Sequence, residues 1–326
     1  MIATNKPQFL VDLERDGFVV VPGVIPKEEC AAFRESALQW LESFPHGFVR
    51  DDRSTWTEEH LPYGPTGGLY NRYSVNHEDF VWRIRTQPGI LDTFAAIWGT
   101  DDLIASFDGM NTTMPINADT GRTDIAPTPA WPHIDQNPRR IDRFELYQGI
   151  ANLAPNGPDD GGLCVLRGSH KLHEAHFAAI GGFRPAADLG PTENSYRYPP
   201  HDFEWYTAHG AEVVKVCAGE GDLILWDSRT VHWNASPTGT QTRFVSYVCY
   251  CPRSHMSEDE LRTKLEIFRN REGTTHWPFM NVVPARRKVG GVPTRPDGTP
   301  DPANRKRPFR DVKETPEVMR LVGVRV

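Results

Sequence analysis

The feature that most constrains the fold is a series of short β-rich segments between about residues 102 and 255. The segments are LIASFDGM, FELYQGIANL, GLCVLRGS, AEVVKVCA, DLILWDS and TRFVSYVCYC. Turn-forming residues separate them, as in NGPDDGG at 156–162 and AGEGD at 218–222. Many short strands joined by turns are typical of a β-sandwich or a barrel. The sequence therefore predicts a mainly β fold.

Helical segments are expected before this β region. After a strand at 17–21, a helix is expected to begin near Pro26, because apolar residues recur there at helical spacing. These residues are Cys30, Phe33, Ala37, Trp40 and Leu41. A second helical region is expected at 77–98, with an interruption at Pro88.

The length of 326 residues is compatible with a single decorated domain. Its expected parts are an N-terminal helical support at about 1–100, a core jelly roll at about 102–255 and a C-terminal extended tail at about 280–326. Residues 284–310 are rich in Pro, Gly, Arg and Lys, which favours an extended segment, and a short helix is expected near Glu317 to Leu321. The interval from His173 to His209 lacks clear alternation and is interpreted as an insertion over one mouth of the barrel.

Charge and composition argue against several classes of partner. Lys and Arg total 36 against 43 Asp and Glu, which gives a net charge of −7 and no general basic field to attract nucleic acid or an anionic membrane. No apolar run approaches the ~18 residues that a membrane span needs. Five scattered cysteines do not suggest a disulfide framework. We therefore expect a cytoplasmic protein without nucleic-acid or membrane partners, and the sequence does not indicate its oligomeric state.

Two short segments contain residues of the types that bind iron. His133-Ile134-Asp135 precedes a predicted strand, and His232 follows the later segment LILWDSRTV. Two histidines and one carboxylate on one face of an octahedron leave the opposite face open, the arrangement of non-haem Fe(II) oxygenases. In an extended segment His133 and Asp135 project to the same side, so both can reach one metal ion. The alternative is a hydrogen-bonded loop pair without a metal.

Arg243 lies 11 residues beyond His232, within the β run TRFVSYVCY. An inward-facing guanidinium in an apolar strand can neutralise the far carboxylate of a metal-chelated diacid with two charged hydrogen bonds. The alternative is an exposed arginine that forms an ion pair. The order of His-x-Asp, a distant His and a strand Arg favours the first interpretation.

Two other groups of residues imitate functional sites. His170, His173 and His176 are spaced by three, as in a helical zinc site. We expect His170 to close a structural turn and the other two to lie on a solvated face. Cys249 and Cys251 fall on one face of a strand, where buried, unreactive packing is the better interpretation.

Four segments together resemble a known family. They are Asp16 to Gly23 (DGFVVVPG), Trp131 to Asp135 (WPHID), Asp160 to His170 (DGGLCVLRGSH), and Gly221 to Asp227 (GDLILWD) leading into His232 and Arg243. In order and spacing they resemble the phytanoyl-CoA dioxygenase-like branch of the Fe(II)/2-oxoglutarate-dependent oxygenases, over about residues 10 to 255. The resemblance implies a double-stranded β-helix, a cupin-like jelly roll, with flanking α-helices.

The resemblance also implies roles for individual residues. His133, Asp135 and His232 would be the catalytic Fe(II) ligands, and Arg243 would bind the distal carboxylate of 2-oxoglutarate. Asn234 stands where the family often has a hydroxyl residue that assists this carboxylate. Gln148 stands where relatives often carry an aromatic residue; it is expected either to hydrogen-bond the cosubstrate or substrate, or to be satisfied by neighbouring backbone.

The expected activity is an Fe(II)-, 2-oxoglutarate- and O2-dependent oxidation with release of succinate and CO2. Because a carboxylate fills position 135, hydroxylation is favoured over halogenation. The expected substrate is a small molecule, either an amino or imino acid or a secondary-metabolite intermediate. Alternatives are desaturation, epoxidation, ring closure, or a non-catalytic binding protein with the same fold. Candidate substrate contacts are Trp131, Trp226, Trp233, Arg139 and the patch 70–73.

Overall fold

Two antiparallel β-sheets form the centre of the molecule in the computed structural model, which describes residues 6–182, 194–279, 282 and 292–325. The larger sheet has the order β1 (Phe18–Val21), β10 (Leu223–Asp227), β6 (Tyr147–Asn152), β12 (Arg243–Val248), β4 (Met110–Thr113) and β2 (Leu69–Tyr70). The smaller sheet has the order β8 (Tyr196–Arg197), β5 (His133–Ile134), β11 (His232–Pro237), β7 (Asp160–Arg167) and β9 (Glu212–Lys215). β13 (Tyr250–Pro252) and β3 (Leu103–Ala105) pair separately.

The inner faces of the two sheets pack against each other. One buried cluster combines Ile150 and Val245 of the larger sheet with Leu163 and Val165 of the smaller sheet. This is how a jelly roll buries the apolar side of each alternating strand. The predicted mainly β, jelly-roll fold is confirmed.

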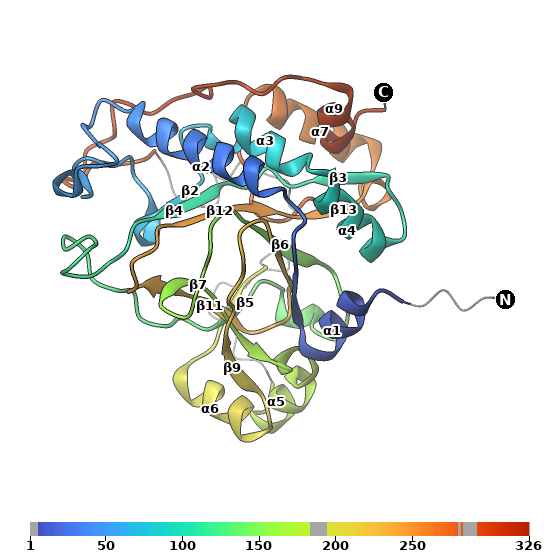
Figure 1. Cartoon of the computed structure of the whole chain (residues 1–326). Coiled ribbons are helices and arrows are strands. Elements are labelled where there is room, and N and C mark those ends of the chain that lie inside the picture. Colours follow the sequence, from blue (N-terminus) through green and yellow to red (C-terminus); the bar gives the residue numbers. More distant parts are fainter. Residues whose placement is uncertain (1–5, 183–193, 280–281, 283–291, 326) are drawn as a thin grey trace.

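A helical layer covers the outer face of the larger sheet. It contains α2 (Lys27–Glu42), α3 (Asp79–Arg85) and α4 (Pro88–Trp98), and Figure 1 shows α2 and α3 lying over the strands β2, β4 and β12. The five apolar residues expected to face inward from α2 are all buried. Pro88 occupies the first turn of α4, so it starts a second helix where the sequence predicted an interruption.

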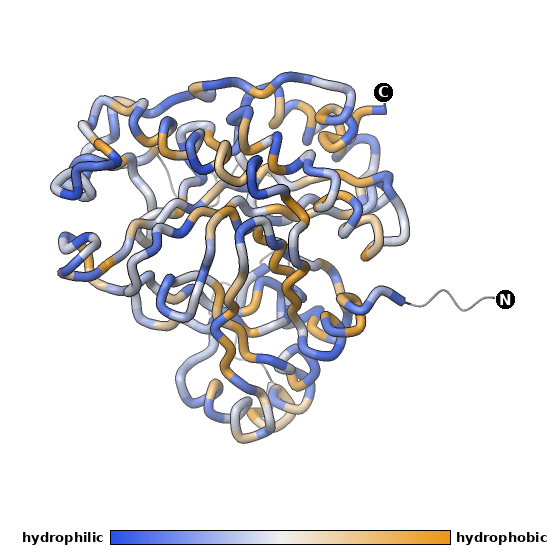
Figure 2. Tube along the Cα trace, in the orientation of Figure 1, coloured by the Kyte–Doolittle hydropathy of each residue, from blue (hydrophilic) through white to orange (hydrophobic). Residues whose placement is uncertain are grey.

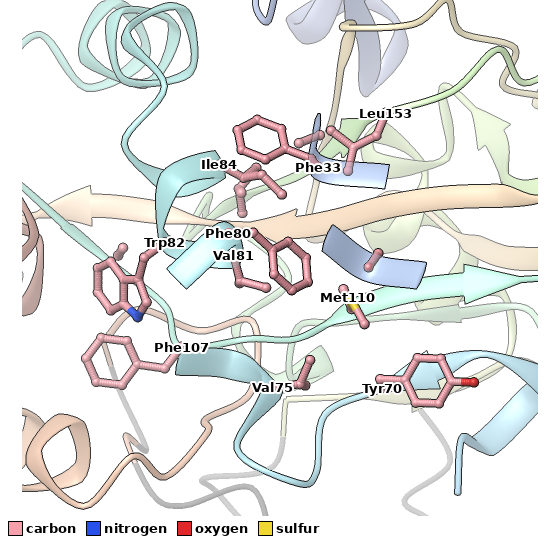
Figure 3. Packing of buried hydrophobic residues seen from close by; sticks show 14 of the residues in the cluster. Phe33, Tyr70, Val75, Phe80, Val81, Trp82, Ile84, Phe107, Met110 and Leu153 are labelled. Atoms are coloured by element: carbon pink, nitrogen blue, oxygen red, sulfur yellow. The ribbon is translucent and has the colours of Figure 1, made fainter. Parts of the chain in front are cut away.

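The largest hydrophobic cluster lies between this helical layer and the larger sheet. Figure 3 shows Phe33 of α2 and Phe80 of α3 near Leu153 and Met110, which follow or belong to strands of that sheet. In Figure 2 hydrophilic and hydrophobic residues alternate along α2, as an amphipathic helix requires.

The C-terminal segment returns over the helical layer, where Figure 1 shows it in red above α2. Residues 284–291 of the expected tail lie outside the described residues, and 292–310 form no helix or extended strand. The short helix predicted near Glu317 to Leu321 is present as α9 (Pro316–Val322), which packs against β3 and α7 (Glu258–Arg269). Val318, Leu321 and Val322 of α9 complete the same hydrophobic cluster as Phe33.

The interval from His173 to His209 contains α5 (His173–Ala179), β8 and α6 (Pro200–Ala208), and its residues 183–193 lie outside the described part. The expectation that His173 and His176 are solvated is wrong. Both are buried, because α5 packs against α6 and β8. His173 Nε2–H donates to Arg229 O at 2.6 Å, and its Nδ1 accepts from the Tyr206 hydroxyl at 2.7 Å.

The remaining helix of the N-terminal region, α1 (Gln8–Asp16), precedes β1 and ends at Gly17, whose φ of +82° is a left-handed cap. A side chain at Gly17 would also collide with Thr230 and His170.

Among the described helices, none has both the length and the apolar character required to cross a bilayer.

Candidate metal centre

The structure brings His133, Asp135 and His232 together at one end of the smaller sheet. His133 in β5 and His232 in β11 are direct cross-strand partners. Asp135 follows β5, and its backbone N–H donates to Ser228 O at 3.0 Å, which fixes the turn. The carboxylate oxygens lie 3.7 Å from His133 Nε2 and 3.3 Å from His232 Nε2. One candidate ligand atom from each residue lies within 4.8 Å of the others.

Backbone carbonyls orient both imidazole rings. Nδ1 of His133 lies 3.2 Å from Trp131 O, and Nδ1 of His232 lies 2.9 Å from Thr230 O. Since a carbonyl only accepts, each Nδ1 carries the proton and each Nε2 presents its lone pair, as metal-binding histidines do. Burial lowers the pKa of His133 to about 3, with His232 adding to the effect, so this ring is neutral. Trp131 stacks on it at 4.2 Å between ring centroids.

The Asp135 carboxylate receives a hydrogen bond from the opposite sheet. Nε2 of Gln148, a buried residue of β6, donates to Asp135 Oδ2 at 3.0 Å. Burial alone would raise the pKa of Asp135, but charge interactions with His276 and His133 hold it below its usual value. Asp135 is therefore an anionic candidate ligand whose carboxylate accepts a hydrogen bond from an amide. From the sequence, Gln148 was expected to contact only the cosubstrate, the substrate or neighbouring backbone.

Arg243 faces the space between the two sheets, as its sequence position suggested. It is 6% exposed, and a Cβ placed on Gly162 of β7 would lie 3.0 Å from its Nε. Gly162 has a φ of +95°, so glycine is required there both for the backbone and for this close approach. Among the described residues, Arg243 has no carboxylate within 4.0 Å. A buried guanidinium that lacks a carboxylate partner is suited to binding an anionic ligand.

Asn234 lies two residues after His232 in β11 and thus on the same side of the strand. Its Oδ1 is buried and forms no hydrogen bond with the described residues. Trp226 Nε1 is also buried and forms no hydrogen bond with the described residues, and the Trp226 ring centroid lies 5.4 Å from that of His232. Buried polar atoms without a partner are rare, and these two belong to a residue of the His232 strand and to a ring that contacts His232.

This donor set fits Fe(II). Two neutral imidazoles and one carboxylate match the facial triad of non-haem iron oxygenases, and the unsatisfied polar atoms beside it suit further bound groups. His133, Asp135 and His232 would hold the ion, and Arg243 with Asn234 would face its diacid chelator.

Sequence reasoning missed one residue near this centre. His276 follows α7, and its Nε2 lies 4.0 Å from Asp135 Oδ2. It belongs to no motif and stands 33 residues beyond Arg243, so spacing along the chain carries no signal for it.

The other sequence candidates for substrate contacts are dispersed. Trp233 points away from the triad and packs on Phe203 of α6 at 5.5 Å between ring centroids. Tyr70 and Tyr73 are buried in the large hydrophobic cluster, and Arg72 lies over the ring of Tyr63. Arg139 is exposed on a short turn after β5. Trp131 and Trp226 are the candidates that contact the metal-binding histidines.

A sequence model of the family "Phytanoyl-CoA dioxygenase (PhyH)" matches residues 13–245. The chain belongs to the phytanoyl-CoA dioxygenase family. This family is a branch of the Fe(II)/2-oxoglutarate-dependent oxygenases, so its cofactors are Fe(II) and 2-oxoglutarate with O2 as the oxidant, in agreement with the triad.

Two curated relatives and one solved structure are also similar to this chain. The "Ava biosynthesis cluster protein O" of Aspergillus versicolor is 37% identical over 268 residues, covering 82% of this chain and 84% of the relative. A "putative phytanoyl-CoA dioxygenase" of Dictyostelium discoideum is 22% identical, with 74% of each chain covered. The crystal structure of GIG2 (DUF1479) from Candida albicans matches in fold, with a TM-score of 0.61 at 14% identity, over 99% of this chain and 77% of that one.

Proposed function

We propose that this protein is an Fe(II)/2-oxoglutarate-dependent dioxygenase that hydroxylates a small molecule. The observation that carries the proposal is the triad on one sheet and a buried arginine on the other, which forms no ion pair with a carboxylate in the part of the chain that the structure describes. The relative named as a biosynthesis cluster protein supports a secondary-metabolite intermediate as the substrate. An amino or imino acid is the other substrate class that the sequence suggested.

The chain's own residues prepare the site for binding rather than for chemistry. His133 and His232 present Nε2 because their Nδ1–H groups donate to backbone carbonyls. Gln148 holds the Asp135 carboxylate from the opposite sheet. Arg243 would bind the distal carboxylate of 2-oxoglutarate, and Asn234 would add a hydrogen bond beside it. When bound, iron and 2-oxoglutarate supply the power to oxidise an unactivated C–H bond, while the barrel excludes water.

The test is an anaerobic titration of metal-free protein with Fe(II) and 2-oxoglutarate. We expect the visible charge-transfer band of an iron–2-oxoglutarate chelate in the wild type. In Arg243→Ala the same band is expected at a much higher 2-oxoglutarate concentration, because the charged hydrogen bonds to the distal carboxylate are lost. Absence of the band in a folded wild-type protein would overturn the proposal and leave a binding protein as the better description.

Product analysis then tests the reaction type. With a substrate found by screening biosynthetic intermediates, mass spectrometry should show a gain of one oxygen atom and a matching yield of succinate. A loss of two hydrogen atoms without oxygen gain would mean desaturation or ring closure in place of hydroxylation.

A further inference from the structure

A row of side chains crosses the inner face of the smaller sheet and extends beyond the triad. His232 of β11 is the direct cross-strand partner of His133 in β5, and His133 is the direct partner of Arg197 in β8. Directly opposed residues of an antiparallel pair project to the same side of the sheet. Tyr196 and Tyr198, on either side of Arg197, are buried in the cluster that α5 and α6 form against the outer face. Arg197 therefore shares the inner face with the two histidines.

Aromatic contacts link Arg197 to the metal position. Trp131 stacks on His133, with 4.2 Å between ring centroids and 12° between ring planes. The guanidinium carbon of Arg197 lies 5.4 Å from the centroid of the Trp131 ring. A guanidinium over an aromatic face keeps the N–H groups along its edge available to a planar oxyanion. Because Arg197 is exposed and has no carboxylate within 4.0 Å in the described part of the chain, these groups are open to a ligand.

Arg197 and Arg243 lie on opposite sides of the triad. The smaller sheet runs β8, β5, β11, β7, so the strands of the two histidines are the central pair of these four. Arg197 belongs to β8, whereas Arg243 approaches Gly162 of β7. Neighbouring strands lie ~4.8 Å apart, so a group bound by Arg197 stays within the length of a small molecule from the metal position. The site thus offers two separate positions for anions, one on each side of the candidate metal ligands.

We propose that Arg197 determines substrate specificity by binding a carboxylate of the substrate at the exposed edge of the site. This inference rests on the proposed function, in which Arg243 binds 2-oxoglutarate. The substrate class is a small carboxylic acid that is oxidised at a carbon a few bonds from its carboxylate. An amino or imino acid carries this group, and a secondary-metabolite intermediate meets the requirement when it carries an acid.

The experiment measures paramagnetic relaxation of probe protons by protein loaded with Mn(II) and saturating 2-oxoglutarate. The probes are cyclohexanecarboxylate and cyclohexanecarboxamide, which share one ring and differ in the charge of the polar group. In the wild type we expect the carboxylate protons to relax at least about threefold more strongly than the carboxamide protons, because charge-assisted, two-point hydrogen bonds strengthen binding. The methylene protons of 2-oxoglutarate report separately on the metal and cosubstrate site.

Variants separate carboxylate binding by Arg197 from general damage. Arg197→Gln should lower relaxation of the carboxylate to the level of the carboxamide, and Arg197→Lys should retain part of the preference, because the charge remains without the two-point geometry. Arg310→Gln is the matched control, because Arg310 is also exposed and lies over an aromatic ring, 5.6 Å from the centroid of Phe309 in the C-terminal segment. It should change neither probe. Unchanged relaxation of 2-oxoglutarate shows that each variant holds its metal and cosubstrate.

The outcomes distinguish the two proposals. If 2-oxoglutarate is not relaxed in the wild type, the proposed function itself fails. If it is relaxed but the two probes relax equally or not at all, or Arg197→Gln keeps the preference for the carboxylate, the specificity proposal is overturned. A loss of 2-oxoglutarate relaxation in Arg197→Gln would also overturn it, because Arg197 would then serve the cosubstrate.

Discussion

The two sheets of the barrel hold their functional side chains in different ways. The smaller sheet presents His133 from a strand of only two residues, and hydrogen bonds to nearby carbonyls orient its histidines. The larger sheet presents Gln148 and Arg243 from six-residue strands whose outer side is packed under the helical layer. The comparison teaches that the candidate metal ligands are oriented by local hydrogen bonds, whereas the residues facing them from the larger sheet are positioned by the global core.

The largest effect is expected from removal of the metal carboxylate. Asp135→Ala should abolish iron binding and turnover, a loss greater than the ~10- to 100-fold that outer residues of a metal site cause. Stability should change little, because Asp135 contributes nothing to the hydrophobic clusters. Isothermal titration with Fe(II) under anaerobic conditions measures the affinity. Wild-type affinity in this variant would remove Asp135 from the ligand set.

A substitution in the helical layer is expected to have the opposite effect, lowering stability and leaving metal affinity unchanged. Phe33→Ala creates a cavity at a fully buried position and should lower the free energy of unfolding by about 3–5 kcal/mol. Metal affinity of the folded fraction should remain that of the wild type, since Phe33 lies in α2. Urea denaturation followed by circular dichroism measures the loss, and Phe33→Leu provides a milder variant. A parallel loss of metal affinity would contradict the independence of the two regions.

Arg243→Ala tests the contribution of the larger sheet to cosubstrate binding. Loss of charged hydrogen bonds worth ~1.5–3 kcal/mol should raise the 2-oxoglutarate concentration for half-saturation about 10- to 100-fold. Arg243→Lys keeps the charge but not the two-point geometry, so its 2-oxoglutarate requirement should fall between those of the wild type and Arg243→Ala. An unchanged requirement for 2-oxoglutarate in Arg243→Ala would show that another cation binds the distal carboxylate.

Gln148→Leu tests the hydrogen bond that crosses from one sheet to the other. Without the amide, Asp135 loses a donor that fixes its orientation, and metal affinity should fall about 10-fold, the lower end for outer residues of a metal site. Gln8→Leu is the matched control, because Gln8 also donates to an aspartate, Asp12 at 3.1 Å, but on the exposed surface of α1. Equal effects of the two substitutions would contradict a positioning role for Gln148.

The smallest effect on the candidate metal centre is expected from the contact between the C-terminal segment and the helical layer. Burial raises the pKa of Glu78 to about 7, although the backbone N–H groups of Arg310 and Phe309 act against the shift. An acid with a raised pKa stabilises the fold below its unfolded pKa, near 4.5, and this contribution is lost as pH rises through about 7. We expect the free energy of unfolding to decline by about 3 kcal/mol over this window, since each unit of pKa shift corresponds to about 1.4 kcal/mol. Urea midpoints against pH should show it in the wild type and not in Glu78→Gln, with Glu266→Gln as an exposed control.

The sequence predicted the elements that rest on local pattern. The helix after Pro26 and its five buried residues followed from periodicity, and the β runs followed from turn residues and alternation. The grouping of His133 with His232 was proposed from residue types and their order and was supported by family resemblance, because local pattern cannot tell that β5 pairs with β11. One available signal was overlooked: Ser257 and Glu260 form a capping box that starts α7.

Residues placed by tertiary contacts escaped prediction. His173 and His176 were expected in solvent because spacing on a helix does not reveal that α6 covers it. His276 depends on a segment held by Phe107 and Lys264, which lie far from it in sequence or on another element. The bond from Gln148 to Asp135 requires the two sheets to close, so no strand pattern contains it.

The position of α9 has a consequence for how the molecule forms. Its residues Val318, Leu321 and Val322 close the hydrophobic cluster over the larger sheet, but they are made well after β12. At a synthesis rate of ~5–20 residues per second, the strands of the barrel are available several seconds before this last piece of core. During that interval the nascent chain leaves exposed the apolar surface of β3 and α7 that α9 later covers.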